Sequence, residues 1–252
     1  IESWLNDQAT VETRGRILSI YNFILLMSMA LGQALINVGP VSSSTPFMLA
    51  AVLLVLAIVP VGLTSKLAPA PVAATKVSFS LLYQRSRSAF AGALLSGLVV
   101  GSFWSLGAVF ARSNSVTQSD ISWFISAAIL GGGILQYPIG LLSDRIDRRK
   151  VLLLLCVGGA LTSLVVAASV GQSWHLVSVF LFGAMVMPIY AMSLATAADV
   201  AESSEFVQIG TSVLMLNAIG ALFAPLALGQ LMSMLGAPAL FWSFAAICTL
   251  FM

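Results

Sequence analysis

The sequence predicts an all-α polytopic membrane protein with eight transmembrane helices. Of its 252 residues, 59% are hydrophobic and only 8% are charged, and the charges fall between long uncharged runs. Soluble domains carry roughly 25% charged residues, so this composition argues against an ordinary soluble chain. A hydrocarbon core about 30 Å thick needs roughly 20 apolar residues per helix, and each of the uncharged runs exceeds that length.

Three of the uncharged runs are too long for a single crossing. Each of them carries turn residues near its middle, such as Gly39-Pro40 in the first and Gly171-Gln172-Ser173 in another. Dividing the long runs at these turns leaves helices of ordinary membrane length, except for a short last one. The expected spans are 17–38, 47–64, 88–111, 121–143, 151–170, 176–198, 206–233 and 239–252.

The basic residues fall almost entirely on one side of these spans. If Arg14 and Arg16 face the cytoplasm, the loops at 65–87, 144–150 and 199–205 face it too. Ten of the 11 Lys and Arg residues then lie on that side, and only Arg112 lies outside. Such a bias is the positive-inside rule of membrane proteins. We therefore expect a multi-pass protein of the cytoplasmic (inner) membrane.

Residues 65–87 form the longest polar connection and are rich in Ala and Pro. We expect them to be a cytoplasmic central linker between a first domain at 1–64 and a second domain at 88–252. Within the linker, Val77–Tyr83 is apolar enough to lie along the membrane surface.

The densest group of charges lies at Gly140–Lys150, which holds six of the 20 charged residues. Gly140 permits close helix approach. Asp144 follows a helix end, where its carboxylate is placed to accept hydrogen bonds from the start of the helix expected near 206. Arg145 and Arg148 are expected to face the acidic residues of the neighbouring loop. Those acidic residues are Asp199, Glu202 and Glu205. We interpret the charged loop and its acidic partners as a conformational latch, and the alternative is that the loop only anchors the chain among lipid headgroups. The latch residues are Gly140, Asp144, Arg145, Arg148, Asp199 and Glu202.

In order, spacing and position, this segment resembles the signature loop of the major facilitator superfamily. That loop runs Gly-x-Leu-x-Asp-Arg-x-Gly-Arg-Arg-Lys and joins the second and third helices of each half. Asp147 stands where the family usually has Gly. The resemblance implies a twelve-helix transporter bundle, of which this chain would be a fragment from the end of helix 4 to within helix 12. Glu2–Asp7, Ser80–Tyr83 and the approach Gly131–Pro138 are similar to the bacterial YcaD-like branch.

Polar and aromatic groups within the spans are candidates to line a substrate cavity. No Asp, Glu, Lys or Arg lies deep in any expected span, so a charge that couples transport to an ion is not visible. Interhelical hydrogen bonding is the alternative for the polar residues, and lipid contact for the aromatic ones. The candidate cavity residues are Asn22, Gln33, Phe103, Trp104, Gln136, Tyr190 and Asn217.

We expect a secondary active transporter that moves a small molecule by alternating access and is coupled to protons or another ion. No nucleotide-binding signature or metal-ligand spacing is present in the sequence, and we expect a monomer with no cofactor, no metal and no nucleic-acid partner. Its partners would be the small-molecule substrate and membrane lipid. A non-transporting sensor or scaffold of the same fold is one alternative. A membrane-embedded transferase is a weaker one, because no second acidic pair follows Asp144 and Asp147.

Overall fold

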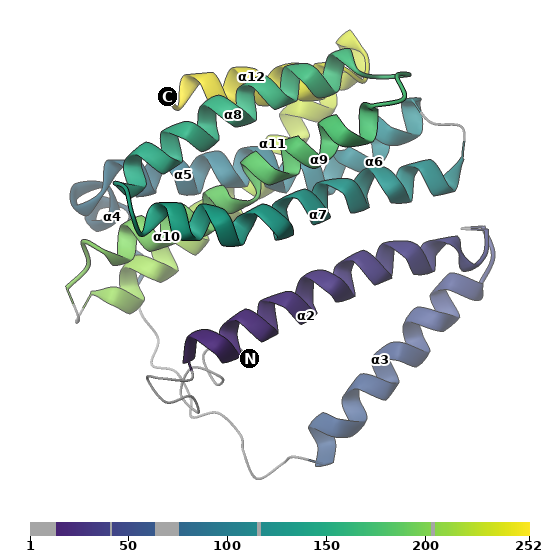
Figure 1. Ribbon diagram of the computed structural model, residues 1–252, viewed down its shortest axis with the longest axis horizontal. Coiled ribbons are helices and arrows are strands. Elements are labelled where there is room, and N and C mark those ends of the chain that lie inside the picture. The colour runs from purple at the N-terminus through teal and green to yellow at the C-terminus, as the bar shows by residue number, and fades with distance from the viewer. Residues whose placement is uncertain (1–13, 41, 64–75, 115–116, 203–204) are drawn as a thin grey trace. The chain divides into compact units, whose positions relative to one another are not determined.

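The computed structural model is helical through its described part, where it contains no β-strand. The chain divides into two compact units, Ile1–Ala74 and Thr75–Met252 (Figure 1). The structure describes residues 14–40, 42–63, 76–114, 117–202 and 205–252.

The first unit holds two helices, α2 (Arg14–Leu35) and α3 (Thr45–Leu63). A single 3-10 turn, η1 (Ile36–Val38), extends α2 before the chain reverses. Ser43 closes the reversal, because its N–H and its hydroxyl both donate to the carbonyl of Pro40, at 2.9 and 2.7 Å. These helices coincide with the first two expected spans to within a few residues.

The second unit holds the remaining six spans. One is built from α5 (Arg87–Ser96), the π-helical turn η3 (Gly97–Gly101) and α6 (Ser102–Asn114). Another joins α9 (His175–Val186) to α10 (Pro188–Ala198). The other four are single helices: α7 (Gln118–Ser143), α8 (Arg148–Ala168), α11 (Phe206–Leu235) and α12 (Ala239–Leu250).

The predicted fold class is confirmed. All eight expected spans are helical, and five of those in the second unit are long and apolar enough to cross a membrane. Three shorter apolar helices lie among the described residues at Met27–Val38, Thr45–Pro60 and Ala239–Leu250.

Helices that are distant in the sequence pack against each other in the second unit. α7 lies along α9, α8 lies along α12, and α11 lies along α5 and η3 (Figure 1). Lipid chains are as apolar as the helix surfaces, so hydrophobicity alone does not drive helices together in a membrane. Close backbone approach and van der Waals contact do so instead.

Glycines provide that close approach. A Cβ atom added to Gly131 of α7 would collide with the carbonyl oxygen of Phe180, and one added to Gly183 of α9 would collide with that of Ala128. The backbones of η3 and α11 also touch where they cross, because a Cβ at Gly97 would collide with the carbonyl oxygen of Asn217. At both crossings there is no room for a side chain between the two backbones.

An aromatic cluster fills the region where α6 ends and α9 and α12 begin. The ring of Phe241 lies edge-on to Phe110, with centroids 4.7 Å apart, and to Phe182, with centroids 5.1 Å apart. Phe103 joins the cluster through Phe182 at 5.6 Å and Phe124 at 5.9 Å. The two edge-to-face contacts of Phe241 favour one arrangement of the rings.

A short helix, α4 (Phe79–Arg85), occupies the end of the expected linker. Ser78 caps it by accepting from the N–H of Leu81 at 3.3 Å, and its own N–H donates to the Ser212 hydroxyl of α11 at 2.9 Å. Leu82 is fully buried in an apolar cluster with residues of α5, α10 and α11. This part of the linker therefore packs on the second unit, because its apolar face has a protein partner there. Residues 64–75 lie outside the described residues.

Gly183→Ala is expected to lower the thermal stability of the protein, because even a methyl group would force α7 and α9 apart. Overpacking of this kind costs roughly 1–3 kcal/mol. Gly210→Ala is a matched control, since its Cβ would lie 3.9 Å from the nearest atom, in Leu194. Ala also favours helix more than Gly does, so the control should melt at the same temperature or higher. The measurement is the fraction of full-length protein that stays monodisperse after heating in detergent. Equal losses in the two variants would contradict this packing.

Candidate functional site

Charged side chains gather at the end of the second unit where α4, α7 and α10 end and α8 and α11 begin. Their positions follow from the membrane-length helices on either side, because a charge within the hydrocarbon is costly. Six side chains are joined by ion pairs and are called the charged cluster below: Arg85, Asp144, Arg148, Asp199, Glu202 and Glu205.

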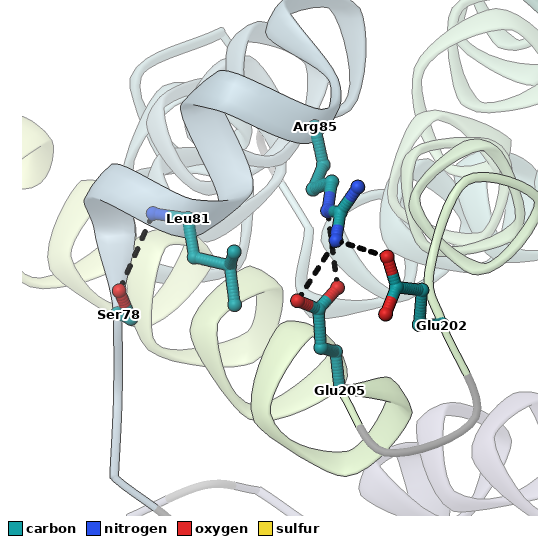
Figure 2. Close-up of polar contacts among 5 residues, drawn as sticks. All are labelled: Ser78, Leu81, Arg85, Glu202 and Glu205. Atoms are coloured by element: carbon teal, nitrogen blue, oxygen red, sulfur yellow. Dashed lines mark hydrogen bonds and ion pairs between the residues drawn. The ribbon is translucent and has the colours of Figure 1, made fainter.

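Arg85 ties the end of α4 to the turn that precedes α11. Its Nε donates to Oε2 of Glu205 at 3.0 Å, and its Nη2 donates to Oε1 of Glu205 at 2.9 Å. The same Nη2 also donates to Oε1 of Glu202 at 2.6 Å (Figure 2). A two-pronged contact between a guanidinium and a carboxylate fixes direction as well as distance.

The pKa values in this contact shift in the directions that the charges require. The hydrogen bond from Arg85 lowers the pKa of Glu205 below its ordinary value. In return, hydrogen bonds to Glu205 and then to Glu202 raise the pKa of Arg85. The side chains of Arg85 and Glu205 keep 36% and 20% of their exposure, so solvent screens the pair. Its main effect is therefore to fix the position of α4.

Ser86 explains why Arg85 is placed at a corner of the chain. Its N–H closes α4 by donating to the carbonyl of Leu82 at 2.8 Å, and its hydroxyl caps α5 by accepting from Ala89 at 3.2 Å. One serine thus ends one helix and begins the next. The backbone turns sharply there, with Arg85 before the turn and Arg87 after it.

Arg148 forms the second contact of the charged cluster. Its Nε lies 3.1 Å from Oδ2 of Asp199 at the end of α10, and its Nη2 lies 3.6 Å from Oδ1 of Asp144. The connection before α8 is fixed locally, because Oδ1 of Asp147 caps that helix by accepting from the N–H of Arg149 at 2.8 Å. Arg148 therefore links the α7–α8 connection to the end of α10.

The structure brings together part of the predicted latch. Arg148 and Asp199 are in contact, and Asp144 joins them through Arg148. Glu202 is paired with Arg85 instead of with the α7–α8 connection. Arg145 forms no ion pair with any residue that the structure describes.

Of two expectations about the start of this connection, one is not met by contacts in the structure and the other falls outside the described residues. No atom lies within 4 Å of a Cβ added to Gly140, so the close helix approach expected there is absent in this packing. The partner expected for Asp144 was the helix start near Ser203 and Ser204, which lie outside the described residues.

Sequence reasoning missed the role of Arg85. It counted Arg85 only among the basic residues that set orientation, and it considered Glu205 as a partner for other arginines. The available signal was the spacing of Glu202 and Glu205, which places two carboxylates one turn apart just before a helix. Nothing in the sequence indicated which arginine would reach them, because Arg85 lies 120 residues from Glu205 along the chain.

The candidate cavity residues of the second unit occupy different environments. Phe103 is 1% exposed in the aromatic cluster, whereas its neighbour Trp104 is 42% exposed. Asn217 donates from Nδ2 to the carbonyl of Ala93 at 3.4 Å, which is an interhelical hydrogen bond. Two further candidates lie on α7 and α10, where Gln136 is exposed and Tyr190 is half-buried beside the cluster around Leu82.

In the first unit, Gln33 is half-buried on α2, and the side chain of Asn22 lies outside the described part of the chain. Over the described residues, no group of three or more His, Cys, Asp or Glu side chains is placed to hold a metal ion.

Comparison with known proteins confirms the resemblance seen in the signature loop. The family model described as Major Facilitator Superfamily matches residues 89–252. An uncharacterized MFS-type transporter of Enterobacter sp. (strain 638) is 26% identical over 254 residues, covering 100% of this chain and 66% of the relative. Uncharacterized MFS-type transporters named YcaD are 25% identical in Escherichia coli O17:K52:H18 and 24% identical in Escherichia fergusonii.

The two YcaD proteins bear out the similarity to the YcaD-like branch. The match covers 100% of this chain and 66% of the E. coli protein, and 89% of this chain and 59% of the E. fergusonii protein. The chain thus spans less than two thirds of the length of these relatives. No solved structure matches it significantly.

The contribution of the Arg85–Glu205 pair should depend on pH. A carboxyl group whose pKa is lowered by folding stabilises the fold above its unfolded pKa, and this is lost as pH falls through the folded pKa. Glu205→Gln should therefore lower the melting temperature at neutral pH. The difference from the parent protein should shrink as the pH falls below about 4, the ordinary range of a glutamate. It should be smallest below the lowered folded pKa of Glu205, where the parent carboxyl group is also neutral. In an Arg85→Gln background the same substitution should have little effect at either pH. A difference that persists unchanged in acid, or in that background, would contradict the pairing.

Proposed function

We propose that this chain, which belongs to the Major Facilitator Superfamily, forms part of a secondary active transporter that moves a small molecule across the cytoplasmic membrane. In such a transporter two helical halves rock around a site near the middle of the membrane. The observation that carries the proposal is the charged cluster. It joins three connections at one end of a bundle whose spans hold no Asp, Glu, Lys or Arg near their middle.

The charged cluster would act as a latch on the cytoplasmic side. The positive-inside bias supports that side for Arg14, Arg16 and the connections 65–87, 144–150 and 199–205. Arg148 and Asp199 would hold the cytoplasmic ends of α8 and α10 together. Release of this contact would favour opening toward the cytoplasm, because a state that keeps the ion pair is stabilised relative to one that loses it.

The position of α4 supports a mechanical role for Arg85. The chain runs from the first unit to the second through the linker, and α4 is the last part of that linker. Arg85 fixes the end of α4 to the turn before α11, so a displacement carried by the linker would reach α11 as well as α5. Arg85 is therefore proposed as the point at which movement of one half is transmitted to the other.

The face proposed for the substrate is uncharged in the described spans. Amide and aromatic groups such as Gln136, Asn217 and Trp104 would contact the substrate in this half. A carboxylate that couples transport to protons or another ion would then lie elsewhere in the whole protein. The proposed partners are the substrate and membrane lipid, and the proposed state is a monomer.

A thermal-stability screen of the purified full-length protein tests the function. The panel holds sugars, amino acids, organic acids, nucleosides and cationic drugs, each at about pH 5.5 and 7.5. A ligand present at 100 times its Kd stabilises the folded state by about 2.7 kcal/mol. A ligand found in this way should show saturable flux into proteoliposomes. Binding without flux for every such ligand would contradict transport and favour a sensor of the same fold.

The latch is tested by charge reversal at one contact. Arg148→Asp is expected to reduce flux by about fivefold or more, a typical size for a coupling between states. Combining it with Asp199→Arg should restore much of the flux, since the ion pair is then rebuilt in the opposite direction. Lys150→Gln is the matched control, because it removes a neighbouring positive charge outside the charged cluster. Loss in the single variant without any recovery in the combined variant would contradict the latch.

A further inference from the structure

We propose that the second unit binds the phosphate group of an anionic membrane lipid in a pocket beside the charged cluster. The pocket lies where α4 meets α5 and where α8 begins, and its volume is about 390 Å³. Three of its lining residues are arginines and none is acidic. This binding does not depend on the transported substrate. The lining residues are Gln84, Arg85, Ser86, Arg87, Ser88 and Arg149.

Two of the three guanidinium groups have no acidic partner among the residues that the structure describes. Arg85 is engaged by Glu202 and Glu205. Arg87 lies over the ring of Tyr83, with Cζ 5.3 Å from the ring centroid, and neither it nor Arg149 forms an ion pair with a described residue. Unneutralised cations that share a pocket repel each other and attract an anion. Arginine suits a phosphate especially well, because its fork matches two phosphate oxygens.

The start of α5 adds to this attraction. The first N–H groups of a helix have no carbonyl partner within it, and the helix dipole places partial positive charge there. The Ser86 hydroxyl is already committed to capping Ala89, and it lies 3.2 Å from the Ser88 hydroxyl. Ser88 is half-buried at the pocket wall, which it shares with Arg87 and Arg149. A phosphate in the pocket would thus meet guanidinium, hydroxyl and backbone N–H donors.

The position of the pocket favours a lipid phosphate over a free phosphate ion. The α5 and α8 spans begin at Arg87 and Arg148, so the pocket lies at the level where headgroups meet the protein. Leu153 and Leu164 of α8 lie within about 60° of Arg149 around the helix, and they are 46% and 50% exposed. Exposed apolar side chains in line below a guanidinium suit acyl chains that extend from a bound phosphate. A free phosphate would gain nothing from that face.

A neighbouring hollow shows that charge, and not shape alone, distinguishes this pocket. That hollow measures about 470 Å³ and is also partly lined by Arg149. Its wall includes Asp144, Asp147 and Asp199 together with Arg148, so its charges are mixed. An anion is therefore expected in the first pocket and not in the second.

Native mass spectrometry of the delipidated full-length protein tests the proposal. The probes are phosphatidylglycerol, phosphatidylcholine and inorganic phosphate. Phosphatidylglycerol should bind about tenfold tighter than phosphatidylcholine, and Arg87→Gln with Arg149→Gln should weaken its binding by roughly tenfold or more, because each basic residue near an anionic surface adds about fivefold. Lys150→Gln should weaken it by less than about threefold, because Lys150 lines neither hollow.

Two results would overturn the proposal. Equal weakening by the double variant and by Lys150→Gln would mean that a basic surface attracts the lipid without a defined pocket. Displacement of phosphatidylglycerol by inorganic phosphate at equal concentration would assign the pocket to the free ion. If the double variant fails to fold, Arg87→Lys with Arg149→Lys keeps both charges but loses the fork. It should then weaken binding severalfold, and unchanged binding would contradict the contact.

Discussion

The backbone contact between α7 and α9 is the constraint on which the rest of the second unit depends. Gly131 and Gly183 each leave no space for a side chain, so the two helices can cross only at this point. The crossing sets the rotation of α9 and brings Phe182 against Phe241 of α12. The similar crossing of η3 and α11 positions α11 against the first span of this unit. Glu205 directly precedes α11, where Arg85 contacts it. The position of the charged cluster follows from contacts deeper in the bundle.

This order of dependence separates two kinds of interaction. The glycine contacts are buried, have no adjustable side chain and would have to be broken for the helices to separate. The ion pairs of the charged cluster are partly exposed to solvent, so each contributes little to stability and can open at small cost. A transporter needs both, because each half must move as a stiff body while the contacts at its ends exchange. The structure has the stiff elements in the spans and the exchangeable ones at Arg85 and Arg148.

Much of the fold could be predicted because a membrane imposes a length on each apolar segment. Breaks between spans were also visible, and Gly171 and Gly236 adopt φ values of 79° and 88° that favour glycine. The charge pattern of Gly140–Lys150 predicted the family. Rotation of the helices could not be predicted, because their sequences are apolar on every face. For that reason the sequence did not distinguish a buried Phe103 from a cavity residue, and it did not pair Arg85 with Glu205.

The most direct test of whether the charged cluster holds the helix ends together is to measure how easily solvent reaches the spans from the cytoplasmic side. A single cysteine at Gln136 or Asn217, in full-length protein without other cysteines, reports this access through its rate of maleimide labelling. Neutralising Arg85 and Arg148 together is expected to speed cytoplasmic labelling by about fivefold or more. Labelling of a cysteine at Ser113, at the far end of α6, should not change. If neutralising the two arginines leaves the labelling rate unchanged at the cysteine in position 136 and at the cysteine in position 217, the proposed latch is contradicted.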